Sequence, residues 1–167
     1  MITLNNILVA TDFGEASEAA LRYGRELAKR FDATLHVLTV AENVAIATLG
    51  AETFAAVAPQ LQHEIEAAAR HALNEALIDS DHSGPVTRPA VVTSSSPASA
   101  IVDYAHEHHI NLIVMGTNGR GVLEHFLMGS VAERVVRLAP CPVLTVRARE
   151  RDFVRPDTLV RVRAARA

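Results

Sequence analysis

The sequence predicts an α/β fold: a doubly wound, mostly parallel five-stranded sheet with helices on both faces. Short apolar runs alternate along the chain with longer segments in which apolar residues recur at helical spacing. The hydrophobic content is 49%, but only two Tyr and five Phe are present and Trp is absent. The core must therefore be built mainly from Ala, Val, Leu and Ile, as in buried parallel sheets. A chain of 167 residues is the size of about one domain.

The first two predicted strands are joined by a helix. Residues 7–10 form a short apolar run, which Thr11-Asp12-Phe13-Gly14 ends with residues typical of a turn. Apolar residues then recur at helical spacing, with Ser17 or a near neighbour as the cap and Asp32 where the helix stops. Residues 34–40 form the second strand, so this segment is a β-α-β unit with parallel strands.

The middle of the chain predicts a long helix and an interrupted strand. Residues 41–58 are apolar and irregular, and they fit a loop, a short helix or a lid. Pro59 suits the first turn of a helix whose apolar face extends to Leu77. Residues 86–93 form the third strand, in which Pro89 indicates a sheet edge or a bulge.

Two further helix–strand pairs complete the predicted sheet. Ser96-Pro97 is typical of a helix N-terminus. Residues 112–115 form the fourth strand, Ser130-x-x-Glu133 predicts a helix capped by Ser130, and residues 142–146 form the fifth strand. We expect one domain over residues 1–147, followed by a basic C-terminal extension over residues 148–167.

Composition limits the classes of partner. The net charge of −3 disfavours a nucleic-acid-binding domain, and no apolar run approaches the ~20 residues that span a bilayer. The single Cys141, between two prolines, fits a reducing compartment and a buried thiol rather than a nucleophile. His106 and His109 are expected to share a helical face, but no carboxylate or Cys stands nearby at ligand spacing, so we expect no metal site there. We therefore expect a cytoplasmic protein without a membrane or nucleic-acid partner.

A glycine-rich loop lies between the fourth strand and the last helix. Gly116, Gly119 and Gly121 leave room for an anion, and the amides of the following helix N-terminus favour negative charge. The spacing matches neither the P-loop nor the dinucleotide fingerprint. The loop is therefore either a phosphate site or a plain connection. In doubly wound sheets ligands lie beyond the carboxyl ends of the strands, so we expect Ala10-Thr11-Asp12 to face this loop across a crevice.

The spacing Gly116-x2-Gly119-x9-Gly129-Ser130 resembles the ATP-binding signature of the universal stress protein family. The resemblance covers about residues 3–147 and includes the segments "NNILVATDFGEASEAALRYGRELAKRFDATLHVLTV" and "SSSPASAIVDYAHEH". It implies a Rossmann-like sheet, usually in a homodimer paired through the last strand. Two positions depart from the family pattern, Asn118 in place of His and Ser95 in place of Gly, and neither change removes a phosphate donor.

The resemblance also implies roles for individual residues. Gly116 and Gly119 would approach the phosphates of ATP, and Gly129 and Ser130 would bind them from the helix start. Asp12 would bind the ribose hydroxyls or an associated Mg²⁺, although it could instead only close its turn. The adenine pocket and the flanks of the loop complete the set: Ala10, Thr11, Val40, Met115 and Val131. Arg120 either neutralises phosphate or lies in water.

These observations favour an ATP-binding stress-response module that acts by changing shape or partners, with slow hydrolysis at most. No Lys lies in the loop and no general base is evident, so we assign no catalytic residues. Two alternatives remain open at this point. One is a nucleotide-hydrolysing or adenylyl-transferring enzyme on the same scaffold, and the other is a structural dimer without nucleotide.

Overall fold

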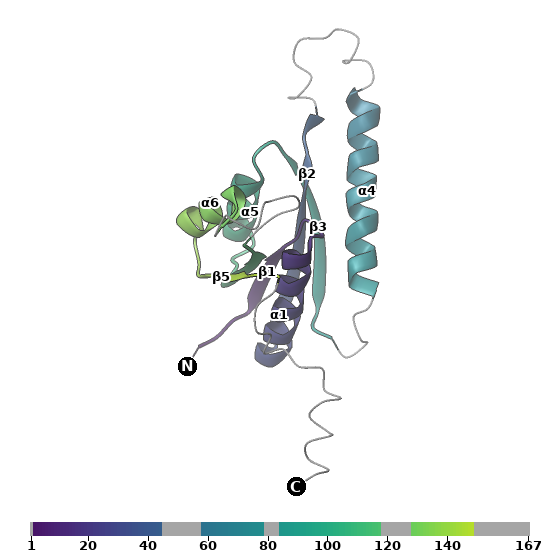
Figure 1. The fold of residues 1–167 in the computed structure, drawn as a ribbon. Coiled ribbons are helices and arrows are strands. Elements are labelled where there is room, and N and C mark those ends of the chain that lie inside the picture. The colour runs from purple at the N-terminus through teal and green to yellow at the C-terminus, as the bar shows by residue number, and fades with distance from the viewer. Residues whose placement is uncertain (1, 45–57, 79–83, 118–127, 149–167) are drawn as a thin grey trace.

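The computed structural model describes residues 2–44, 58–78, 84–117 and 128–148, and these form an α/β structure around a five-stranded sheet (Figure 1). The strands lie in the order β3-β2-β1-β4-β5, and each pair is parallel. The elements in chain order are β1 (Asn6–Ala10), α1 (Glu15–Phe31), β2 (Thr34–Glu42), α4 (Ala58–Ile78), β3 (Thr87–Ser94), α5 (Pro97–Glu107), β4 (Leu112–Gly116), α6 (Ser130–Leu138) and β5 (Val143–Val146).

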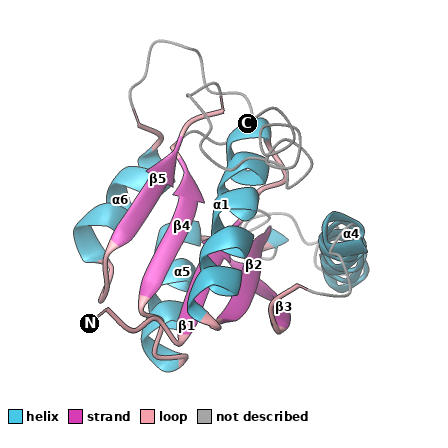
Figure 2. Ribbon diagram, turned by 90° about the horizontal axis from the view of Figure 1, so that it is seen from below, coloured by secondary structure: helices cyan, strands magenta, loops and turns pink. Residues whose placement is uncertain are grey.

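The strand order makes the sheet doubly wound, as predicted. The chain adds β2 and β3 on one side of β1 and then returns to add β4 and β5 on the other. Helices α1 and α4 cover one face, and α5 and α6 cover the opposite face (Figure 2). The order of the strands therefore reverses between β1 and β4, where ligands bind in such sheets.

The core consists of small and branched apolar side chains on both faces of β1, β2 and β4. Ile7, Leu8 and Val9 of β1 are completely buried. A methyl group at Gly24 of α1 would overlap Val9 Cγ2, so this glycine allows the helix to lie close to the sheet. None of the helices in the described ranges is long and apolar enough to cross a membrane.

Several predicted element boundaries are confirmed. Asp32 ends α1 in the left-handed conformation, with φ 53°. Pro97 lies in the first turn of α5 behind the N-cap Ser96. Pro89 lies in β3, which is an edge strand that pairs only with β2 among the described residues. Of the segment 41–58, residues 45–57 lie outside the described residues, as do residues 149–167 of the predicted extension.

Two predicted caps and one helical face are wrong. Gly14 is the N-cap of α1 and Ser17 lies inside the helix, while Gly129 is the N-cap of α6 and Ser130 is its first residue. His106 and His109 do not share a helical face, because α5 ends at Glu107 and His109 has φ 50°. In each case the chain begins or ends its helix at a residue that the side-chain capping pattern does not mark.

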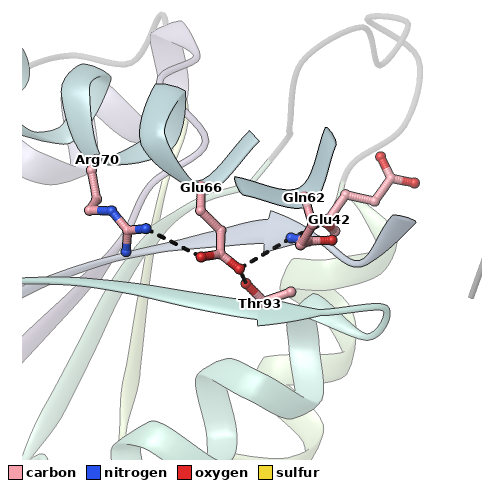
Figure 3. A network of polar contacts seen from close by, with 5 residues as sticks. All are labelled: Glu42, Gln62, Glu66, Arg70 and Thr93. Carbon is pink, nitrogen blue, oxygen red and sulfur yellow. Dashed lines mark hydrogen bonds and ion pairs between the residues drawn. The ribbon is translucent and has the colours of Figure 1, made fainter. Parts of the chain in front are cut away.

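Helix α4 covers the sheet less completely than its apolar pattern predicts. Within α4 only Leu73 is buried, and Leu61 remains 39% exposed. Polar contacts instead fasten its first half to the carboxyl ends of β2 and β3 (Figure 3). The Thr93 hydroxyl donates to Glu66 Oε1 at 2.7 Å, and Gln62 Nε2 donates to the Glu42 carbonyl at 3.2 Å.

Candidate functional site

A cavity of about 280 Å³ lies at the carboxyl ends of β1, β2 and β4, on the side of the sheet that α5 and α6 cover. Its position coincides with the reversal of strand order between β1 and β4. All four described helices begin at this edge, and α1, α5 and α6 contribute residues to the cavity. The residues that line the cavity are Ala10, Thr11, Asp12, Ser17, Leu38, Val40, Pro97, Ile101, Met115, Gly116, Thr117, Gly129, Ser130, Val131 and Ala132.

The cavity brings together every predicted site residue that the structure describes. These residues come from four separate segments of the chain: Ala10, Thr11, Asp12, Val40, Met115, Gly116, Gly129, Ser130 and Val131. The remaining two predicted residues, Gly119 and Arg120, lie outside the described residues.

Sequence reasoning missed Ser17, Leu38, Pro97, Ile101, Thr117 and Ala132. Two signals point to some of them. Leu38 lies two residues before Val40 and therefore faces the same side of its strand. Pro97 and Ile101 are four residues apart at the start of α5, so they share one face of that helix.

The apolar part of the cavity is formed by β2 and α5. Leu38 is completely buried and Ile101 is 4% exposed, so both side chains are fixed by packing. Val40 and Met115 lie in the same apolar cluster. A flat apolar group such as an aromatic base fits a pocket of this kind.

The polar part of the cavity is the N-terminus of α6. The Gly129 amide donates to the Thr117 carbonyl at 2.7 Å, and the Gly129 carbonyl accepts the amide of Glu133 at 2.9 Å. The amides of the next three residues, Ser130, Val131 and Ala132, have no backbone acceptor among the described residues. Gly129 therefore orients the helix start with its own amide already bonded, and the amides of the three following residues remain without a backbone acceptor in this part of the structure.

Gly116 has a packing role that the sequence does not reveal. A Cβ atom at this position would lie 2.9 Å from both the carbonyl carbon and the Cβ of Ala16 in α1. The absence of a side chain therefore lets the end of β4 contact the first turn of α1. Gly116 lines the cavity, but this contact alone is enough to require glycine.

The turn after β1 is held by side-chain hydrogen bonds. Asp12 Oδ1 accepts the Gly14 amide at 3.1 Å, and Thr11 Oγ1 accepts the Phe13 amide at 3.0 Å. Phe13 has φ 61°, a conformation that non-glycine residues adopt rarely. Asp12 thus closes its turn and also lines the cavity, so the two roles considered for it are compatible.

The charges at the two neighbouring helix starts differ. The first turn of α1 carries Glu15 and Glu18 and follows Asp12, whereas the first turn of α6 carries only Glu133. No Lys or Arg lines the cavity within the described part of the chain. An anion is therefore favoured at the α6 side, where backbone amides supply the positive potential, and a cation or hydroxyl group at the α1 side.

Away from the cavity, the buried His36 of β2 contacts two aromatic rings, the half-buried Tyr104 of α5 and the exposed His108 that follows this helix. His36 Nδ1 lies 3.0 Å from the Tyr104 hydroxyl, while His36 Nε2 is buried without a hydrogen-bond partner among the described residues. Burial lowers the pKa of His36, and the neighbouring His108 and Arg88 lower it further. The described ranges hold no group of three His, Cys, Asp or Glu side chains placed to bind a metal ion.

Cys141 is half-buried rather than fully buried. Burial raises the pKa of its thiol, which keeps the side chain protonated at neutral pH and makes it a poor nucleophile. This agrees with the expectation of an unreactive thiol.

The comparison with protein families decides what kind of protein carries this site. The model of the universal stress protein family matches residues 3–147. The chain is a member of this family. Two proteins named as universal stress proteins are similar to it over most of their length. One, from Methanocaldococcus jannaschii, is 33% identical, and the match covers 87% of this chain and 84% of that protein. The other, from Staphylococcus aureus strain USA300, is 34% identical, and the match covers 90% of this chain and 88% of that protein.

Solved universal stress proteins have the same fold. The structure of one from Lactobacillus plantarum is 28% identical with a TM-score of 0.73, and the match covers 88% of this chain and 100% of that one. A universal stress protein in complex with cAMP is 23% identical with a TM-score of 0.59, covering 89% and 100%. One from Archaeoglobus fulgidus in complex with dAMP is 22% identical with a TM-score of 0.61, covering 87% and 99%.

Proposed function

We propose that this universal stress protein binds an adenine nucleotide in the cavity between β1, β2 and β4, and that its preferred ligand is ATP with Mg²⁺. The observation that carries the proposal is the arrangement of three groups around one cavity. The unbonded amides of α6 lie on one side, the Asp12 turn on another, and an apolar pocket from β2 and α5 lies between them.

Each part of the nucleotide has a matching group. The base packs against Leu38, Val40 and Ile101, and the phosphates accept hydrogen bonds from the amides of Ser130 to Ala132. Asp12 holds the ribose hydroxyls or the Mg²⁺, because its carboxylate lies beside the acidic start of α1, where phosphate is disfavoured. Gly119 and Arg120 stay predictions for the outer phosphates.

Two further facts support an adenine nucleotide. Related universal stress proteins have been solved in complex with cAMP and with dAMP, which share an adenine base and one phosphate. The cavity volume of about 280 Å³ lies near the lower end of the ~300–1,000 Å³ typical of small-molecule sites. A nucleoside with its first phosphate fits this space, and further phosphates extend past the start of α6.

We further propose a regulatory rather than an enzymatic role. The described cavity lining contains one carboxylate and no His, Lys or Arg, so it offers little to activate a water or to stabilise a leaving phosphate. The protein would signal through nucleotide occupancy as a homodimer paired through β5, an edge strand of the sheet.

The test uses two substitutions at one position. Gly129 has φ −73° and ψ 154°, which a following proline tolerates, and Pro is well accepted as the first residue of a helix. Ser130→Pro therefore removes an amide donor without disturbing α6, whereas the matched control Ser130→Ala removes only the hydroxyl. Titration calorimetry would measure the affinities of both variants and the wild type for ATP, AMP, cAMP and adenosine, with and without Mg²⁺.

We expect the wild type to bind ATP more tightly than AMP or cAMP and to bind it best with Mg²⁺. Ser130→Pro should weaken ATP binding by about 10- to 100-fold, since a hydrogen bond to a charged group contributes ~1.5–3 kcal/mol. Its affinity for adenosine, which has no phosphate, should not change. A wild-type chain that binds none of the nucleotides would refute the proposal, and unchanged ATP affinity in Ser130→Pro would refute the phosphate position.

A further inference from the structure

A pair of buried hydroxyl groups lies behind the turn that carries Asp12. Thr11 is 8% exposed and Ser17 is 3% exposed, and Thr11 Oγ1 donates to Ser17 Oγ at 3.2 Å. Ser17 Oγ in turn donates to the Gly14 carbonyl at 2.9 Å. The two side chains thus connect the end of β1 to the first turn of α1.

Hydrogen bonds involve every residue of this turn, from Thr11 to Gly14. Thr11 Oγ1 accepts the Phe13 amide, and Asp12 Oδ1 accepts the Gly14 amide. The Gly14 carbonyl accepts both the Ser17 hydroxyl and the Glu18 amide. Every residue from Thr11 to Gly14 is therefore bonded directly or through a neighbour to the Ser17 hydroxyl.

The turn needs such support because its backbone is strained. Phe13 has φ 61°, and the left-handed conformation is unfavourable for a bulky residue. Strained residues persist where their surroundings hold them in place, and they cluster at functional sites. A different path at Phe13 would move the neighbouring Asp12 carboxylate away from the cavity.

We propose that Ser17 is a positioning residue for Asp12. Its hydroxyl fixes the strained turn, and the turn directs the Asp12 carboxylate toward the ribose or Mg²⁺ of the bound nucleotide. This role rests on the proposed function, because it requires Asp12 to contact the ligand. Ser17 could otherwise serve only to start α1, and the two roles differ in how a change at Ser17 combines with a change at Asp12.

A double-mutant cycle separates these roles. Titration calorimetry with ATP and Mg²⁺ would compare the wild type, Ser17→Ala, Asp12→Asn and the double variant. Ser99→Ala is the matched control, because Ser99 also forms a hydroxyl pair in the first turn of a helix, with Ser96 at 2.9 Å, but does not line the cavity. If Ser17→Ala does not fold, Ser17→Cys keeps the size of the side chain and weakens the donor.

We expect Ser17→Ala to weaken binding about 5- to 30-fold, and Ser99→Ala to leave it unchanged. In the Asp12→Asn background the change at Ser17 should have less than about twofold further effect, because its action passes through the carboxylate. Equal effects in both backgrounds, or unchanged affinity in Ser17→Ala, would overturn the role of Ser17 alone. A wild-type chain that binds no nucleotide would overturn the proposed function and this role with it.

Discussion

His36 shows how a single buried side chain couples this fold to pH. It is 2% exposed and lies on β2 beneath α5, where Tyr104, His108 and Arg88 surround it. One ring nitrogen is bonded to Tyr104 and the other, Nε2, is buried without a partner in the described part of the chain. A proton added to this ring would enter a site that is poorly hydrated and already close to the Arg88 guanidinium.

We predict that His36 destabilises the protein as the pH falls below about 6.5, the ordinary pKa of histidine. Burial lowers the pKa of His36 in the folded chain, so the unfolded chain binds more protons between that lowered pKa and about 6.5. The free energy of unfolding is therefore highest above this window and decreases through it. Urea unfolding at about pH 8 and about pH 5.5 would measure the decrease, which should be smaller in His36→Phe.

Tyr104→Phe is the control for this prediction. This substitution removes the hydrogen bond to His36 but keeps the buried, titratable imidazole of His36. It should therefore lower the free energy of unfolding at both pH values and retain its pH dependence. Equal pH dependence in the wild type and His36→Phe would show that other groups cause it.

At the scale of an element, α4 depends on polar anchoring more than on burial. The Glu66 carboxylate accepts hydrogen bonds from Thr93 of β3 and from Gln62 and Arg70 of α4 itself (Figure 3). The Thr93 hydroxyl lowers the pKa of Glu66, which keeps the carboxylate ionised and the anchor formed in mild acid. Only Leu73 of this helix is buried in the core.

We predict that Glu66→Ala releases the first half of α4 from the sheet. Hydrogen exchange should become faster in the amides from Ala58 to Arg70 and remain unchanged in α1, because the bond to Thr93 is the contact from Glu66 to the sheet. Glu64→Ala is the matched control, since Glu64 accepts a bond from Gln60 of the same helix. Exchange that is unaltered by Glu66→Ala would indicate that the bond from Gln62 to Glu42 and the apolar contacts around Leu73 are sufficient to hold the helix.

The sequence predicts the strands of this protein better than the first residues of α1 and α6. Apolar runs such as residues 112–115 identify buried strands because side chains on both faces must be apolar. The N-terminal caps of α1 and α6 differ from the prediction because Ser17 and Ser130 fit a capping pattern, while the actual caps, Gly14 and Gly129, offer no side chain. A helix that begins without a side-chain cap is difficult to locate from the sequence.

The site was predictable to the extent that it follows the carboxyl ends of the strands. The strand-end rule predicts that the turn after β1 and the loop after β4 face one crevice, whereas Val40, Met115 and Val131 are implied only by the family resemblance. Pro97 and Ile101 were missed because α5 reaches the cavity only through the packing of two helices on one face of the sheet. The contact of Gly116 with Ala16 was missed for the same reason, since it joins residues far apart in the chain.

At the scale of the whole molecule, the nucleotide-binding unit should be independent of the C-terminal extension. The family match ends at residue 147, β5 ends at Val146, and the described residues that line the cavity lie between positions 10 and 132. We predict that a chain ending at residue 148 keeps the melting temperature and the ATP affinity of the full-length protein. Thermal unfolding and calorimetry of the two chains would measure both.

The same truncation tests the proposed homodimer. If dimerisation occurs through β5 alone, light scattering should show that the shortened chain is still a dimer. Loss of the dimer on truncation would assign the extension a part in assembly, and loss of nucleotide affinity would show that the unit extends beyond residue 147.

The hydrogen bond from the Gly129 amide to the Thr117 carbonyl ties the first turn of α6 to the end of β4. A shift of α6 along its axis would have to break this bond, so the three amides that follow Gly129 keep a fixed distance from the sheet. An anion held by those amides would therefore be anchored to the most rigid part of the molecule.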